Sequence, residues 1–230
     1  MSIAGIISGS NLGVLDYNVD IVICIDMTES MKPLITEIKN NMLSFYEQFK
    51  TKMANKGKNI QKLRAKFVLF SDFMHTKDAI IESRFFKLDE DKAEYLVFFN
   101  NLSLTNGKIK ASNSLEALTK AFMSNWEDEG TIRRQVVLLF SDKEALDFKD
   151  RCDYDNYPYG MPNNLVGLHN LWDDGELDSK TKRLMLFTPN TEKWLIIDKW
   201  VNTYHTVCKV NSGCSNIKFA SCLNMIVESI

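Results

Sequence analysis

Apolar positions along the chain follow two patterns. Strands buried on both faces are predicted where apolar residues run almost without interruption, at residues 19–25, 65–71, 135–140 and 183–188. After the first run, apolar residues recur at intervals of three and four, which predicts one long amphipathic helix. Its expected buried stripe is Met31, Leu34, Ile35, Ile38, Met42, Phe45 and Phe49.

Weaker patterns complete the order of elements. Further helices are expected at residues 89–101, from Asn113 with Glu116 as a capping box, and at residues 165–172, 191–201 and 219–230. Extended segments are expected at residues 79–86, with the charges of a sheet edge, and at residues 204–210. Strands that alternate with helices favour an α/β fold with a doubly wound, mostly parallel sheet flanked by helices and one short antiparallel edge strand. We interpret residues 19–230 as one domain and residues 1–18 as an N-terminal arm.

Composition excludes several function classes. The formal net charge of −2 gives no general attraction to nucleic acid or to an anionic membrane. No apolar run reaches membrane-spanning length, and residues 1–13 lack the basic and apolar regions of a signal peptide. The five cysteines are scattered without metal-ligand spacing, which favours reduced thiols in a cytoplasm. We therefore expect a cytoplasmic protein whose partners are neither nucleic acid nor membrane.

Two short polar stretches carry the candidate chemistry. Asp26, Thr28 and Ser30 place a carboxylate and two hydroxyls at alternate positions directly after the first strand, and Asp142 follows the strand at residues 135–140. In a doubly wound sheet, ligands bind outside the carboxyl ends of the strands, where the strand order reverses. If these two strands are neighbours at that point, the four side chains converge. Carboxylate and hydroxyl oxygens suit Mg²⁺ or Mn²⁺, and an under-neutralised cation can accept an acidic group from a partner.

A structural interpretation competes with this one. Asp26, Thr28 and Ser30 are residue types that cap helices, and they stand where the first helix begins. On spacing alone the two interpretations have similar weight, and Asp142 favours the cation site.

The same stretches resemble a known family. Residues 22–31 are similar to the DxSxS motif of von Willebrand factor A domains, with Thr28 in the middle position, and residues 137–142 resemble the strand and aspartate that close the metal-ion-dependent adhesion site (MIDAS). The likeness extends over most of the chain and is greatest to the intracellular bacterial proteins related to those of tellurium-resistance clusters. The resemblance implies a Rossmann-like sheet and a scaffold role in assembling protein complexes, with kinase or phosphatase systems as expected partners.

One loop departs from the family pattern. The family usually supplies a third ligand ahead of the helix that begins near Ser114, whereas residues 105–112 hold two lysines and no acidic residue. Thr105 or Ser112 can substitute as the ligand. Alternatively, the ammonium of Lys108 or Lys110 can replace the metal between the two aspartates. We therefore predict weak affinity for Mg²⁺ or Mn²⁺, or none.

Two other functions remain open. A haloacid-dehalogenase-like phosphohydrolase would use Asp26 as nucleophile, the pair Asp173 and Asp174 as further acids, and Lys143 as the lysine after a later strand. Thr28 stands where that chemistry needs an acid or base, so we expect no catalytic residues. The second alternative is a scaffold with a degenerate site that binds through other surfaces.

Overall fold

The elements of the computed structural model alternate between strands and helices, and the structure describes residues 15–105, 110–175 and 177–230. The strands are β1 (Leu15–Asp26), β2 (Lys58–Phe70), β3 (Ile80–Glu82), β4 (Phe86–Lys87), β5 (Ala111–Ser112), β6 (Ile132–Phe140), β7 (Glu144–Ala145), β8 (Lys182–Thr188) and β9 (Thr203–Val207). The α-helices are α1 (Lys32–Asn55), α2 (Lys92–Asn100), α3 (Ser114–Phe122), α4 (Leu165–Asp173), α5 (Glu192–Ile197) and α6 (Phe219–Ser229), and the 3₁₀ helices are η1 (Glu29–Met31) and η2 (Phe148–Asp150).

The main sheet has the strand order β3-β2-β1-β6-β8-β9, with β4 paired to β2. Its long strands are parallel, and the short segments β3 and β4 run antiparallel to β2. After β1, the chain adds β2 and the strands paired with it on one side of β1. It then crosses over and adds β6, β8 and β9 on the other side. This order confirms the predicted doubly wound fold, and it places the reversal of strand order between β1 and β6.

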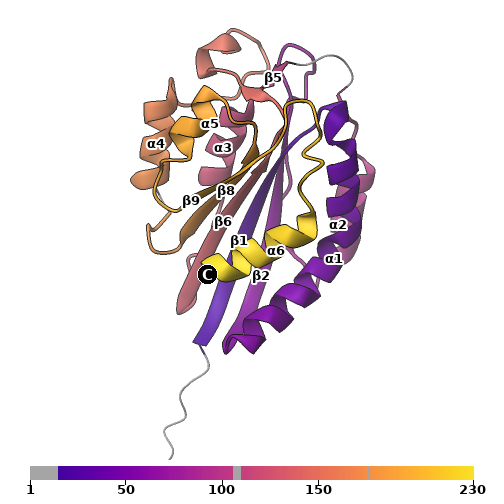
Figure 1. Ribbon diagram of the computed structural model, residues 1–230, viewed down its shortest axis with the longest axis vertical. Helices are drawn as coiled ribbons and strands as arrows, with labels where there is room; N and C mark the ends of the chain where they lie inside the picture. Colours follow the sequence, from indigo (N-terminus) through magenta and orange to yellow (C-terminus); the bar gives the residue numbers. More distant parts are fainter. Residues whose placement is uncertain (1–14, 106–109, 176) are drawn as a thin grey trace, which may run out of the picture.

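Helices cover both faces of this sheet, as Figure 1 shows. Ile21 and Ile23 of β1 belong to the core under α1, α2 and α6, whereas Val22 and Cys24 belong to the core under α3, α4 and α5. Alternate side chains of a strand point to opposite faces, so a strand covered on both faces must be apolar at nearly every position. A slip of one residue would exchange the two sets of side chains, and the two cores therefore define the register of β1. None of the helices described is both long and apolar enough to cross a membrane.

The strand β2 extends further than its apolar pattern predicted. It begins at Lys58, whereas the pattern at residues 56–61 indicates a polar connection. Polar side chains on this extension are paired: Lys62 Nζ lies 2.5 Å from a carboxylate oxygen of Glu127, and Arg64 donates two hydrogen bonds to Asp20. Apolar periodicity misses such a segment because its charged side chains are paired with residues that are distant in the sequence.

The N-terminus of α3 differs from the expected capping box. The carboxamide oxygen of Asn113 accepts a hydrogen bond from the backbone N–H of Phe73 at 3.1 Å and does not cap its own helix. Glu116 is 0% exposed and accepts a hydrogen bond from the hydroxyl of Tyr157 at 3.0 Å. Burial raises the pKa of Glu116 to about 7, although hydrogen bonds oppose the rise.

The segment after β9 closes over the carboxyl ends of the strands. Its backbone N–H at Asn211 donates to the carbonyl of Asp142 at 3.0 Å. Gly213 has a φ of 62°, and a Cβ atom at this position would lie 2.0 Å from the backbone oxygen of Ser30. The backbones at residues 30 and 213 are therefore in direct contact, and only glycine allows both this contact and the left-handed conformation.

Substitution of Gly213 tests this contact. Gly213→Ala should lower the free energy of unfolding by about 3 kcal/mol, because it combines the left-handed penalty with a backbone clash. Gly57→Ala is the matched control, since Gly57 also has a positive φ but no other atom lies within 4 Å of the point where its Cβ would stand. It should cost only about 1 kcal/mol. Urea denaturation measures both values, and equal losses would contradict the close contact.

The buried carboxyl of Glu116 predicts a pH dependence of stability. Because its folded pKa of about 7 exceeds the ordinary value of 4.5, the folded state binds the proton more tightly. The free energy of unfolding should therefore fall as pH rises from about 4.5 to about 7, by up to about 3 kcal/mol from this group, and then level off. Glu116→Gln should remove this component, while the exposed Glu47→Gln should retain it. Denaturation curves from pH 4.5 to 8 would contradict the assignment if the two variants behaved alike.

Candidate functional site

The stretch after β1 folds back on the carboxylate that ends the strand. Asp26 is the last residue of β1, and its Oδ1 atom accepts the backbone N–H of Thr28 at 2.9 Å. The hydroxyls of Thr28 and Ser30 lie 3.2 Å apart as the chain enters η1. No capping hydrogen bond from the Thr28 side chain is present at η1, so its hydroxyl is directed to Ser30 instead. The three side chains form one polar group above the end of the strand.

The parallel pairing of β1 with β6 brings the second half of the site alongside. Ile25 is opposite Phe140, so Ser141 and Asp142 emerge beside Asp26. Ser30 Oγ donates to Asp142 Oδ1 at 3.1 Å. Asp26, Thr28, Ser30 and Asp142 therefore form a connected set of hydrogen-bonded groups, drawn from two strands that are far apart in the sequence.

Further donors surround the two carboxylates. Asp26 Oδ2 accepts the hydroxyls of Ser141 at 2.8 Å and Ser112 at 3.0 Å, and all three residues are fully buried. Burial raises the pKa of Asp26, and hydrogen bonds from Ser141, Thr28 and Ser112 oppose the rise. On Asp142, the Oδ2 atom accepts the backbone N–H of Gly213 at 2.6 Å. Ser141 was not among the predicted site residues, although the repeated Phe-Ser-Asp at residues 70–72 and 140–142 marks it.

The residues considered as a third ligand occupy different places. Ser112 belongs to β5, which pairs with β7 in a small separate sheet, and its hydroxyl reaches Asp26. Thr105 meets the site through its backbone N–H, which donates to the carbonyl of Met27 at 3.0 Å. Lys110 is exposed, and Lys108 lies outside the described residues. Of the two hydroxyl candidates, Ser112 is the one whose side chain contacts a site carboxylate in the described structure.

A different lysine contributes the ammonium next to the site. Lys143 Nζ lies 3.3 Å from Asp142 Oδ1 and donates to Asn211 Oδ1 at 2.5 Å. Lys143 is only 5% exposed. Lys143 was predicted only as the lysine of a phosphohydrolase, although its position directly after Asp142 was a signal for this contact.

The donor set is compatible with a hard divalent cation. Carboxylate and hydroxyl oxygens are the ligands that Mg²⁺ and Mn²⁺ prefer. Within the described ranges, no group of three or more His, Cys, Asp or Glu side chains is placed to hold a metal ion. An ion at this site would therefore depend on the hydroxyls of Thr28 and Ser30 as well as on Asp142.

The acidic pair of the phosphohydrolase hypothesis lies near the amino ends of the strands, away from the candidate site. Asp173 is at the end of α4, and its Oδ1 atom is 3.8 Å from Nζ of Lys182, the first residue of β8. Because β8 and β1 run in the same direction, the start of β8 and the end of β1 lie at opposite ends of the strands. Asp173 and Asp174 therefore do not join Asp26.

Asp72, the aspartate that follows β2, is engaged in an ion pair. Arg151 donates to both of its carboxylate oxygens, at 2.5 and 2.8 Å, and the backbone N–H of Met74 donates at 3.0 Å. Burial opposes ionisation, but the hydrogen bonds from Arg151 and Met74 lower the pKa of Asp72 below its usual value. Its contacts join the loop after β2 to the loop that contains Tyr154 and Tyr157.

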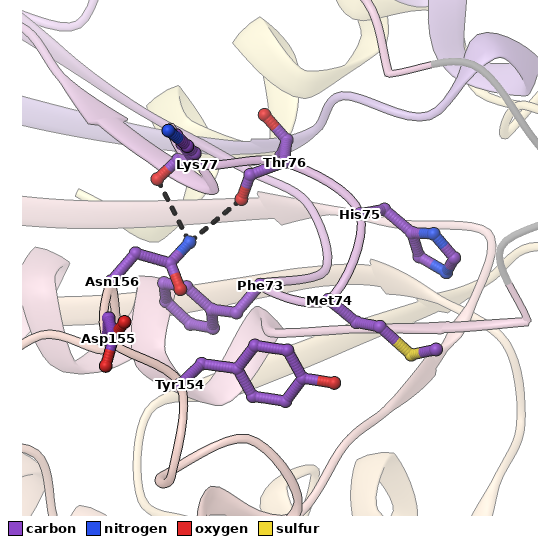
Figure 2. Close-up of a pocket in the computed structure, with 8 residues that line it drawn as sticks. All are labelled: Phe73, Met74, His75, Thr76, Lys77, Tyr154, Asp155 and Asn156. Atoms are coloured by element: carbon purple, nitrogen blue, oxygen red, sulfur yellow. Dashed lines mark hydrogen bonds between the residues drawn. The ribbon is translucent and has the colours of Figure 1, made fainter.

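These two loops enclose a surface pocket of about 520 Å³. Asn156 crosses between them and donates to the carbonyls of Thr76 and Lys77 at 2.9 and 3.0 Å, as drawn in Figure 2. Phe73 forms part of the wall and packs against Tyr157 with ring centroids 5.2 Å apart. The tyrosine loop is thus held against the strand-end loops by polar and aromatic contacts.

Comparison with known proteins identifies the fold. The chain matches no protein-family model, and no curated protein matches it. The pilus adhesin SpaC from Lactobacillus rhamnosus GG aligns with 92% of this chain and 30% of its own length, at 12% identity and a TM-score of 0.55. Its open conformation aligns over the same shares at 11% identity and a TM-score of 0.54.

A third solved structure overlaps less well. Proximal thread matrix protein 1 from the mussel byssus, in a structure with a zinc-occupied MIDAS motif, aligns with 94% of this chain and 48% of its own, at 15% identity and a TM-score of 0.48. The likeness to the adhesin shows a shared fold, and the strand order shows a doubly wound α/β sheet, which is consistent with the von Willebrand factor A-like fold expected from the sequence.

Proposed function

We propose that this chain is a protein-interaction module that binds an acidic group of a protein partner at the strand-end site. The observation that carries the proposal is the convergence of Asp26, Thr28, Ser30 and Asp142 where the strand order reverses, with Ser30 in direct contact with Asp142 at 3.1 Å. Clefts outside the carboxyl ends of parallel strands are the usual ligand positions in such sheets.

The environment of Asp26 favours binding over catalysis. A nucleophilic carboxylate must present an oxygen to its substrate. Asp26 is 0% exposed, and hydroxyl and N–H donors engage both of its oxygens. It acts in this proposal as an internal acceptor that orients Thr28 and the serines around it.

A divalent cation is part of the proposal as a weakly held component. Thr28, Ser30 and Asp142 would hold Mg²⁺ or Mn²⁺, with Asp26 and Ser112 behind them as orienting groups. When bound, the cation would supply positive charge for the acidic group of the partner.

The proposal also covers the cellular compartment and the kind of partner system. The resemblance to the intracellular bacterial proteins of tellurium-resistance clusters supports a cytoplasmic scaffold that acts with a kinase or phosphatase system. The five cysteines are free thiols in the structure, four of them buried, which agrees with a reducing compartment.

Partner capture tests the proposed site. Asp142→Asn and Ser30→Ala should each reduce recovery of a co-purifying partner about tenfold or more, because the first removes the negative charge that holds a cation at the site and the second removes the hydroxyl that contacts Asp142. Tagged wild-type and variant proteins would be compared by quantitative mass spectrometry after purification from cells that make the protein naturally. Circular dichroism would establish that each variant is folded.

Asp72→Asn is the matched control for this experiment. Asp72 also follows a Phe-Ser pair at the end of a parallel strand, but it is paired with Arg151 outside the site. It should leave partner recovery unchanged. Partner recovery that survives in Asp142→Asn and Ser30→Ala would instead favour a scaffold that binds through other surfaces.

A further inference from the structure

Contacts of both its backbone and its side chain fix Lys143 in the candidate site. Its backbone N–H donates to the hydroxyl of Ser141 at 3.1 Å, and its carbonyl accepts the indole N–H of Trp194 at 3.3 Å. Its ammonium lies between Oδ1 of Asp142 and Oδ1 of Asn211. A lysine side chain held in this way loses much of its usual freedom, so the charge has a defined position.

The segment after β9 is shaped to receive this ammonium. Asn211 has a φ of 56°, a left-handed conformation that asparagine tolerates better than most residues. In this conformation its backbone N–H donates to the carbonyl of Asp142 while its side-chain oxygen accepts the ammonium of Lys143. Two contacts from one residue therefore fix residues 142 and 143 together.

The ammonium of Lys143 contacts a carboxylate oxygen that also belongs to the candidate metal site. Asp142 Oδ1 accepts the hydroxyl of Ser30 at 3.1 Å and lies 3.3 Å from Lys143 Nζ. A divalent cation held by Ser30 and Asp142 would use this same oxygen. Two cations on one carboxylate oxygen repel each other, and the repulsion is poorly screened because Lys143 is 5% exposed.

We propose that Lys143 is the resident cation of this site, neutralising Asp142 and suppressing the binding of Mg²⁺ or Mn²⁺. The inference deepens the proposed function, because it concerns the same site and identifies the source of its positive charge. The ammonium donates a hydrogen bond to Asn211 and forms an ion pair with Asp142. Because an ammonium has three donor hydrogens, in this proposal a further one serves a carboxylate oxygen of the partner without a metal.

Calorimetric titration with MnCl₂ tests the inference without any partner. Lys143→Met removes the charge and keeps an unbranched side chain, and it should raise the affinity for Mn²⁺ about tenfold or more over wild type. Lys62→Met is the matched control. It also removes a lysine that is paired with a carboxylate, but Lys62 is eight residues before the end of β2, about 26 Å along the strand. It should leave the affinity unchanged.

Lys143→Gln provides a second test of the inference if Lys143→Met does not fold. Its amide can still donate to Asn211 but carries no charge, so it should also raise Mn²⁺ affinity. An affinity equal to that of wild type in the folded variant would overturn the inference, as would the absence of Mn²⁺ binding in both proteins. Partner capture by Asp142→Asn is measured separately, so failure of the Lys143 inference is distinguishable from failure of the proposed recognition site.

Discussion

The parallel pairing of β1 with β6 is the constraint on which the rest of the site depends. Each strand is buried on both faces, and the opposite positions Ile25 and Phe140 set where their carboxyl ends meet. A shift of one residue in this pairing would send core side chains to the wrong face. The hydrophobic cores therefore place Asp26 beside Asp142, although neither carboxylate contributes apolar contact.

Hydrogen bonding then determines the state of the two carboxylates. Asp26 is surrounded by neutral donors, whereas Asp142 is next to the ammonium of Lys143 and receives the backbone N–H of Gly213. Buried carboxylates are expensive unless they are paired or hydrogen-bonded, and the two here are satisfied by different means. This asymmetry makes Asp142 the more sensitive of the two to an added cation.

A second set of polar contacts supports the loops beside the site. The ion pair of Asp72 with Arg151 and the hydrogen bond from Tyr157 to Glu116 join the loop after β2, the tyrosine loop and α3. Glu116 is buried in this junction, with one carboxylate oxygen unpartnered among the described residues. These contacts hold the neighbouring loops to one another and to α3, through groups that are not part of the site.

The sequence by itself predicted the fold class and four polar side chains of the candidate site. Continuous apolar runs identified β1, β6 and β8. The polar residues that directly follow β1 and β6 marked the site, namely Asp26, Thr28, Ser30 and Asp142, because both signals are local patterns. The start of β2 was missed, since its charged residues are paired with Asp20 of β1 and with Glu127 in the segment before β6, both distant in the sequence.

The tertiary structure alone decided which groups complete the site. Ser112, Ser141 and Lys143 reach the carboxylates through side-chain directions and a small second sheet that no periodicity indicates. Gly213 reaches Asp142 from a segment 71 residues further along the chain. Such contacts depend on how separate elements pack together, and the balance of charge at the site follows from them rather than from local spacing.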